Sequence, residues 1–306
     1  MSICVFGSIN MDITAYSEHL PGPGETIHGE NYLIGLGGKG ANQASAAAKL
    51  GGTVNMIGRI GQDGFGVEAL NQLRKAGVNV ACVRKQEGPT GIAIIGVDAA
   101  GENCITVIGG ANLDMSAADA EAAKLPLNTA KVLLLQNEIP WDASVAAAEK
   151  VKSRKGWVIF DPAPAPQAQM PPESFEWIDI ITPNESETAI LTGIRPDNVI
   201  SAGQAARALL EQGARYVIIK MGSEGLYLAG PEGETAIPAF PVTAIDTVAA
   251  GDCFNAGLAH ALADGAEIAS ACRFAAACGA LSTTRKGAAQ SAPSLSDVDE
   301  FLSQFG

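Results

Sequence analysis

The hydrophobic pattern of this chain alternates between two kinds of segment. Short runs of β-branched and aliphatic residues are each followed by a longer Ala- and Leu-rich stretch with helical spacing. This alternation is typical of a mostly parallel sheet that is sandwiched by helices. The predicted strands are Ser2–Gly7, Val54–Gly58, Lys131–Gln136, Trp157–Asp161, Ile178–Thr182 and Tyr216–Met221. The predicted helices are Gly40–Leu50, Phe65–Ala76, Asp142–Ser153, Glu185–Thr192, Ala202–Gln212, Gly251–Ala263 and Ile268–Thr283.

Two regions break this rhythm. Residues Tyr16–Ile34 and Thr90–Ile108 hold short β-prone pieces that Gly and Asp interrupt, with no helix among them. They predict a small antiparallel β flap, a lid built from about residues 13–36 and 90–110, which would cover the ligand crevice of the main sheet. The alternative is an ordinary extension of the main sheet at its edge. No Pro/Ser-rich linker divides residues 1–306, so we expect one α/β domain that carries this lid.

The composition narrows the choice of partners. Asp and Glu outnumber Lys and Arg by 33 to 20, which gives a net charge of −13. This charge argues against nucleic acid or an anionic membrane as a partner, because both need a basic face. Six Cys without C-x-x-C spacing indicate reduced thiols, and no apolar run approaches membrane-spanning length. We therefore expect a soluble, cytoplasmic protein.

Residues 246–255 read Asp-Thr-Val-Ala-Ala-Gly-Asp-Cys-Phe-Asn and lead into an apolar helix. Small residues at a helix start let bare backbone N–H groups converge on an anion, and the helix dipole adds partial positive charge. A carboxylate beside such a pocket is unusual. A transferable phosphoryl group in the pocket and a substrate hydroxyl at Asp252 would explain both features. The alternative is that Asp252 is only an acid of the first helical turn.

The segment Gly35–Gly40 matches G-x-G-x-x-G, but it is a weak dinucleotide fingerprint because no acid follows from residue 41 to 62. It is not a Walker A loop, because Gly rather than Ser or Thr follows Lys39. Gly37 and Gly38 would let the backbone approach a ligand, while Lys39 and Asn42 would supply polar contacts. The alternative is a tight strand-to-helix turn.

Three other polar motifs follow predicted strands. Asn10 and Asp12 lie two residues apart and would share a face, as polyol binding requires; the alternative is an Asx-rich turn. Glu138 lies just after a strand, at the edge where open α/β sheets bind ligands. Asn184 and Glu187 begin a helix, where they would either cap it or orient water around Mg²⁺ on phosphates.

Together these segments resemble the PfkB-type sugar kinases, most closely the ribokinase branch, over nearly the whole chain. The motifs that carry the resemblance are Gly7–Asp12, Pro23–Thr26, Gly37–Ala44, Gly110–Asn112, Asp161–Ala165, Thr182–Glu185, Asp246–Asn255 and Thr284–Ala288. The resemblance implies a ribokinase-like fold and ATP-dependent phosphorylation of D-ribose at the 5-hydroxyl, giving ribose 5-phosphate and ADP. It also implies a homodimer formed through the β lid.

The resemblance assigns roles to particular residues. Asp252 matches the catalytic base, and the anion hole for the γ-phosphoryl group matches Ala249, Ala250 and Gly251. The sugar-binding positions match Asn10, Asp12, Gly38, Lys39, Asn42, Glu138 and Asp252. The nucleotide-contacting positions match Asn184, Lys220, Gly222, Ser223, Gly225 and Gly251. Glu187 would orient water around Mg²⁺. A monovalent cation, K⁺, would bind at Asp246, Val248, Ser282, Arg285, Gly287 and Ser291.

Two departures concern the nucleotide. Lys220 stands where a small hydroxyl residue is common in the family, and Ala276 stands where a larger side chain can face adenine. At the cation loop, an alternative is that Arg285 pairs with Asp246 and that no ion binds.

Other functions stay open. One is a related kinase acting on 2-keto-3-deoxygluconate, fructose or a nucleoside. Another is a sugar-binding regulator without catalysis, against which the intact Asp252 argues. Asn10, Asp12 and Asn42 together favour a small polyhydroxylated furanose.

Overall fold

The computed structural model describes residues 2–165, 170 and 172–305. Its centre is a nine-stranded sheet in the order β13-β12-β11-β10-β9-β8-β1-β4-β5. Seven neighbouring strands are parallel: β1 (Ser2–Phe6), β4 (Thr53–Gly61), β5 (Asn79–Gln86), β8 (Val132–Gln136), β9 (Trp157–Asp161), β10 (Ile180–Ile181) and β11 (Tyr216–Lys220). Antiparallel strands β12 (Leu226–Gly230) and β13 (Gly233–Ile237) extend one edge.

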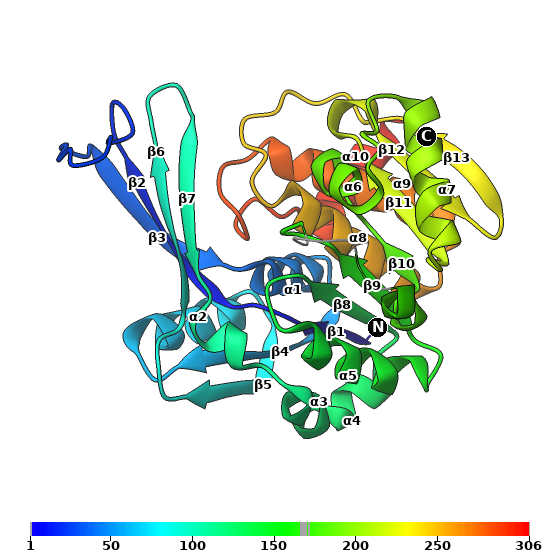
Figure 1. The fold of residues 1–306 in the computed structure, drawn as a ribbon, viewed down its shortest axis with the longest axis horizontal. Coiled ribbons are helices and arrows are strands. Elements are labelled where there is room, and N and C mark those ends of the chain that lie inside the picture. The colour runs from blue at the N-terminus through cyan, green and yellow to red at the C-terminus, as the bar shows by residue number, and fades with distance from the viewer. Residues whose placement is uncertain (1, 166–169, 171, 306) are drawn as a thin grey trace.

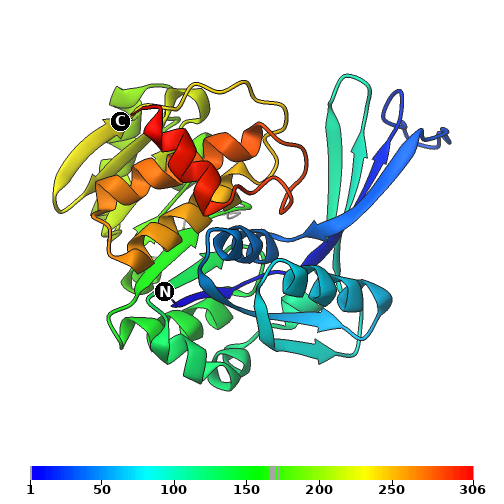
Figure 2. The same ribbon diagram turned by 180° about the vertical axis from the view of Figure 1, so that it is seen from behind.

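Helices cover both faces of this sheet (Figures 1 and 2). The strand β1 shows why: Ile3 and Val5 enter one hydrophobic core, while Cys4 and Phe6 enter the other. The first core is covered by α1 (Lys39–Lys49), α2 (Gly64–Lys75), α8 (Ala250–Asp264) and α9 (Ile268–Thr283), with α10 (Leu295–Ser303) packed on α9. The second is covered by α3 (Ala117–Ala122), α4 (Lys124–Thr129), α5 (Trp141–Lys152), α6 (Glu185–Thr192) and α7 (Val199–Glu211).

A separate sheet of four strands forms the β lid and projects from the main body (Figure 1). Its order is β3-β2-β6-β7, with β2 (Asn10–Tyr16), β3 (Asn31–Gly37), β6 (Gly91–Val97) and β7 (Asn103–Ile108). The two outer pairs are antiparallel, but the central pair β2–β6 is parallel. The expectation of a wholly antiparallel flap is therefore wrong. The chain passes through β4, α2 and β5 of the main body between these two strands, so no hairpin joins them.

The predicted architecture, a mostly parallel sheet sandwiched by helices with a small β lid, is confirmed. The alternative of an edge extension is wrong, because the lid strands form their own sheet. Strands β5, β12 and β13 and helices α3, α4 and α10 were not among the predicted elements. The described residues also include three 3₁₀ turns: η1 (Gly110–Asp114), η2 (Pro172–Trp177) and η3 (Gly222–Glu224). Within the described ranges, every helix is too short or too polar to cross a membrane.

Candidate active site

The start of α8 presents bare backbone N–H groups. Ala249 precedes the helix with a φ of 59°, a left-handed conformation that is uncommon for a residue with a Cβ. The N–H of Ala250 donates to the carbonyl of Thr247 at 3.2 Å. Among the described residues, the N–H groups of Gly251 and Asp252 have no protein acceptor. The first turn of α8 can therefore receive an anion, although the Ala250 N–H is already engaged in the turn.

Asp252 is buried in this first turn and points its carboxylate at α1. The side-chain amides of Asn42 and Gln43 each donate to it at 3.0 Å. Burial raises the pKa of Asp252 to about 6; the Lys39 ammonium opposes the rise, and Asp161 adds to it. Its pKa thus lies close to neutral pH, which suits a general base.

The loop before α1 joins two of the predicted sugar-binding residues to β8. Gly38 has a φ of 83°, and a Cβ there would lie 2.8 Å from the backbone N of Asn10, so glycine is required. The N–H of Lys39 donates to Glu138 Oε2 at 2.9 Å, and the Ser8 hydroxyl donates to the same oxygen. These bonds fix the Glu138 carboxylate just beyond the end of β8.

The ammonium of Lys39 lies in a field of carboxylates. Burial lowers its pKa, but Asp252, Asp161 and Glu138 outweigh burial and hold the pKa of Lys39 well above its usual range. Lys39 therefore remains charged at every physiological pH and offsets part of the negative charge around Asp252.

Asn10 and Asp12 lie two apart on β2 and share one face of the lid, so they are strand residues and not part of an Asx turn. Asn112 Nδ2 donates to Asn10 Oδ1 at 2.7 Å. Burial raises the pKa of Asp12 to about 6, and the carboxylates of Glu138 and Asp252 add to the rise. The charges of Glu138 and of the candidate base therefore act on Asp12.

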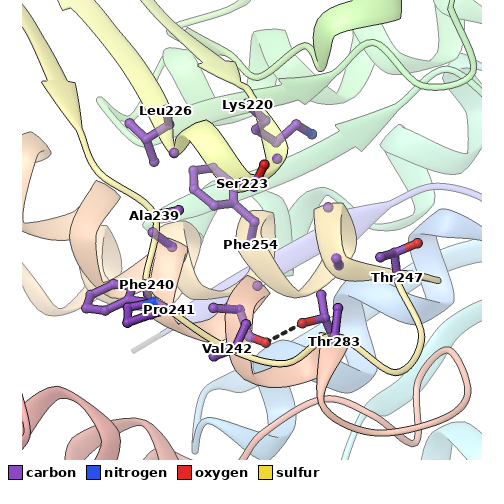
Figure 3. A pocket seen from close by; sticks show the side chains of 18 residues that line it. Lys220, Ser223, Leu226, Ala239, Phe240, Pro241, Val242, Thr247, Phe254 and Thr283 are labelled. Atoms are coloured by element: carbon purple, nitrogen blue, oxygen red, sulfur yellow. Dashed lines mark hydrogen bonds between the residues drawn. The ribbon is translucent and has the colours of Figure 1, made fainter.

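A cavity of about 640 Å³ opens beside the start of α8 (Figure 3). Its volume suits a nucleotide. The wall includes most of the predicted nucleotide-contacting residues, namely Lys220, Gly222, Ser223, Gly225 and Gly251. Asn184 is not among the lining residues, whereas Ala276 is, together with Gly279 and Ala280 of α9. These small residues leave an apolar surface along the cavity.

Lys220 lies where this cavity meets the start of α8. Its Nζ is 3.1 Å from Asp161 Oδ1, and it would be 3.4 Å from a Cβ placed on Gly251. The ammonium is thus positioned between a buried carboxylate and the N-terminus of a helix. An anion bound at that N-terminus would meet Lys220.

Asn184 and Glu187 form the capping box of α6. Asn184 Oδ1 accepts from the N–H of Glu187 at 2.9 Å, and Glu187 Oε2 accepts from the N–H of Asn184 at 2.8 Å. Burial raises the pKa of Glu187; Lys220 lowers it and Asp161 raises it again. The capping interpretation therefore holds, and Glu187 also faces the charges around Lys220.

Asp246 ties the loop before α8 to the loop after α9. Its carboxylate accepts from the N–H of Val248 at 3.0 Å and from that of Gly287 at 2.9 Å. Arg285 pairs with Asp297 at 3.1 Å, so the alternative of an Arg285–Asp246 ion pair is wrong. Of the other predicted cation ligands, Ser282 and Ser291 are buried, and their hydroxyls donate to backbone carbonyls three residues earlier.

Three polar residues near the site carried no predicted role. Gln43 and Asp161 contact the candidate base or its neighbours, and Asn112 fixes Asn10. Each belongs to a short motif of the sequence, but its role depends on partners far away along the chain. The signal that could have found Asp161 is its position at the end of a buried strand, like Glu138.

A helix start that can receive an anion, a buried carboxylate and a cavity of nucleotide size together suit a kinase site. The chain belongs to the PfkB family: residues 1–295 match the model of the pfkB family carbohydrate kinases. It is similar to the ribokinase of Schizosaccharomyces pombe, with 40% identity over 98% of this chain and 97% of that protein. A deoxyribokinase of Salmonella typhi is 36% identical over 99% of both chains.

A solved structure gives the same result. The structure of Arabidopsis thaliana ribokinase complexed with ribose and ATP matches with a TM-score of 0.91 and 34% identity, over 98% of each chain. The protein is therefore a carbohydrate kinase, and its sugar has to be argued from the site.

Proposed function

We propose that this protein transfers the γ-phosphoryl group of ATP to the 5-hydroxyl of D-ribose, giving ribose 5-phosphate and ADP. The observation that supports this proposal most strongly is the position of Asp252. It is coupled to Asp12 of the lid and hydrogen-bonded to Asn42 of α1 on one side, and on the other it directly follows Gly251, which lines the cavity beside α8. Asn42 Oδ1 is buried and has no protein partner among the described residues, so it can accept a bond from a sugar hydroxyl.

The chemistry follows from these positions. The 5-hydroxyl oxygen of the sugar attacks the γ-phosphorus while Asp252 accepts the hydroxyl proton. The bond between the γ-phosphorus and the β–γ bridging oxygen breaks, and ADP is released. The N–H groups of Gly251 and Asp252, with the dipole of α8, stabilise charge on the transferring group. Lys220 adds a positive charge on the nucleotide side.

Mg²⁺ would be held mainly by the phosphates of ATP. In the described part of the chain, no group of three or more His, Cys, Asp or Glu side chains is placed to hold a metal ion. This fits Mg²⁺, which keeps several waters and takes few protein ligands when it binds with phosphates. Glu187 would orient such a water, because its carboxylate lies in the field of Lys220 and Asp161. The ion would offset phosphate charge.

K⁺ fits the paired loops that Asp246 joins. Asp246 is half-buried, and its carboxylate contacts only backbone N–H groups among the described residues. We infer that carbonyl oxygens of Val248 and of the 282–291 loop, with Asp246, bind the ion. Arg285 and Gly287 would contribute through their backbones. The ion would hold the 246–251 turn in position without touching the sugar.

A sugar panel tests the proposal. ADP release should be measured with ribose, 2-deoxyribose, fructose, 2-keto-3-deoxygluconate and a nucleoside, under saturating Mg-ATP. The highest kcat/KM is expected for ribose, with the product phosphorylated at the 5-hydroxyl. If another sugar gives a higher kcat/KM, that sugar and not ribose is the preferred substrate. If ADP is released without a phosphorylated sugar, the proposed sugar kinase function is rejected.

The second candidate substrate is 2-deoxyribose. The Salmonella typhi deoxyribokinase matches this chain over almost its full length at an identity close to that of the ribokinases. The two sugars differ by one hydroxyl. A site that hydrogen-bonds this hydroxyl would reject 2-deoxyribose strongly, because its buried polar groups would be left unpaired.

We also propose that the lid mediates a homodimer. Both faces of the small sheet expose large apolar side chains, including Tyr32, Leu33, Ile94, Ile105 and Val107. Apolar patches of this kind mark interaction surfaces. A second copy of the chain is the occupant proposed here, because the same lid would supply a matching apolar face.

A further inference from the structure

The side-chain amide of Gln43 makes three buried contacts that the proposed chemistry does not use. Its Nε2 donates to Asp252 Oδ1 at 3.0 Å and to Asp161 Oδ2 at 3.2 Å. Its Oε1 accepts from Gln136 Nε2 at 2.7 Å. Gln43 is fully buried, and its amide can take only one orientation, because only the NH₂ end can face two carboxylates.

These contacts connect four elements. Gln43 lies on α1, Gln136 ends β8, Asp161 ends β9, and Asp252 begins α8. Asp161 is in turn held by Lys220 at 3.1 Å. A line of contacts therefore runs from the lysine at the nucleotide cavity to the carboxylate of the candidate base.

The arrangement also fixes the carboxylate of Asp252 in a single plane. Gln43 occupies Oδ1 while Asn42 Nδ2 donates to Oδ2 at 3.0 Å. Two donors on opposite oxygens prevent rotation of the group, and both donors come from the first turns of α1. Each carboxylate oxygen keeps a lone pair with which the base can accept a proton.

We propose that Gln43 is a positioning residue for Asp252, holding the base in one orientation and sharing its amide with the Asp161 carboxylate. This inference rests on the proposed function, in which Asp252 is the base. Two opposite effects follow. The bond from Gln43 stabilises the charged form of Asp252, and the negative charge of Asp161 destabilises it.

The test compares the acid limb of the kcat/KM–pH profile in three proteins: wild type, Gln43→Met and Asp161→Asn. Methionine keeps the length of the side chain but donates nothing. In Gln43→Met the limb should move to higher pH and turnover should fall about 10- to 100-fold, the loss expected for a bond to a charged group. In Asp161→Asn the limb should move to lower pH.

Gln72→Met is the matched control. Gln72 is half-buried on α2 and accepts from the N–H of Leu36, but it contacts no group of the site. The acid limb of the kcat/KM–pH profile of Gln72→Met should stay at the wild-type pH. Loss of turnover in Gln43→Met with an unmoved limb would mean a merely structural role and would overturn the proposal. If Gln43→Met does not fold, the shorter Gln43→Asn, whose amide cannot reach both carboxylates, decides, and an unmoved limb in that variant overturns the proposal.

A second readout separates this inference from the sugar kinase proposal. The titration of the Asp252 carboxyl can be followed by isotope-edited NMR. The signal of Asp252 is identified as the carboxyl signal that disappears in the Asp252→Asn variant. The titration midpoint should rise in Gln43→Met even if no sugar is turned over. An unchanged midpoint rejects Gln43 as the positioning residue, whereas absent turnover with a shifted midpoint rejects only the proposed function.

Discussion

Asp252 carries a buried charge in the first turn of α8, and the proposed chemistry depends on it. Asp252→Asn should reduce turnover by at least ~10²-fold, because it removes the general base, while ribose still binds. In the wild type, activity should rise with pH through the Asp252 pKa of about 6, since only the deprotonated base accepts a proton. Steady-state kinetics and ribose calorimetry check both halves. Near-normal turnover in the variant would remove Asp252 from the mechanism.

The same charge should weaken the fold. The pKa of Asp252 is about 6 in the folded protein and 3.8 ordinarily, so the folded state binds more protons than the unfolded state between those values. The resulting penalty is nearly absent below about pH 3 and complete above about pH 7. Asp252→Asn should therefore raise the free energy of unfolding by up to ~3 kcal/mol at alkaline pH, with no gain near pH 3. Urea unfolding at both pH values tests this difference.

Asp12 offers a separate test of the sugar side. Asp12 on β2 pairs with Gly35 of β3, which has no side chain, and the charge of Glu138 acts on it. This position suits a contact with sugar hydroxyls. Asp12→Ala should weaken ribose binding by about 1–3 kcal/mol, because hydroxyl partners are left unpaired. Binding of a non-hydrolysable ATP analogue should not change. Calorimetry that shows an unchanged ribose affinity would contradict the placement of Asp12.

At the scale of single elements, sequence patterns succeeded where a strand is buried on both faces. Strand β9 has the predicted bounds, Trp157–Asp161, because Gly156 precedes the buried run and Pro162 follows it. Strand β13 was missed because its residues Gly233–Ile237 are mostly exposed, and β5 because polar residues interrupt it. Such edge strands lack the hydrophobic run that marks a central strand.

The site shows a similar division. The helix start at Ala249–Asp252 could be predicted because its anion-binding geometry is local. The contacts of Gln43 could not, because its partners Asp161 and Asp252 lie 118 and 209 residues away. The parallel pairing of β2 with β6 was missed for the same reason. The roles that the resemblance assigned to the site residues stay predictions until the proposed variants are measured.

The two loops joined by Asp246 give a prediction at this scale. Activity with saturating Mg-ATP and ribose should rise several-fold when K⁺ replaces a bulky organic cation at constant ionic strength. The ion would fix the 246–251 turn, which already depends on the bonds from Asp246 to Val248 and Gly287. Asp246→Ala should abolish the response, whereas Asp297→Ala, which frees Arg285, should leave it intact. Equal activity of the wild type in both salts would remove the cation site.

At the scale of the whole molecule, the proposed dimer would connect assembly to catalysis through the lid. Strand β2 carries Asn10 and Asp12 at its base, and the same sheet exposes apolar side chains along its length. A lid left exposed in water would be a liability, since exposed apolar strands promote association. A dimer formed through two lids would cover these side chains and stiffen β2. Sugar binding is thus expected to depend on dimer formation.

A pair of isoleucine variants tests this dependence. Ile105 on β7 is 54% exposed, and Ile200 on α7, far along the chain from the lid strands, is 76% exposed. Ile105→Glu should convert a dimer into a monomer in light scattering and raise the KM for ribose more than the KM for ATP, because a charge cannot be buried unpaired in an apolar interface. Ile200→Glu, the same change at a more exposed site, should leave both the mass and the KM values unchanged. A wild-type protein that is monomeric at micromolar concentration would reject the dimer. An Ile105→Glu variant that stays dimeric would place the subunit contact outside the lid.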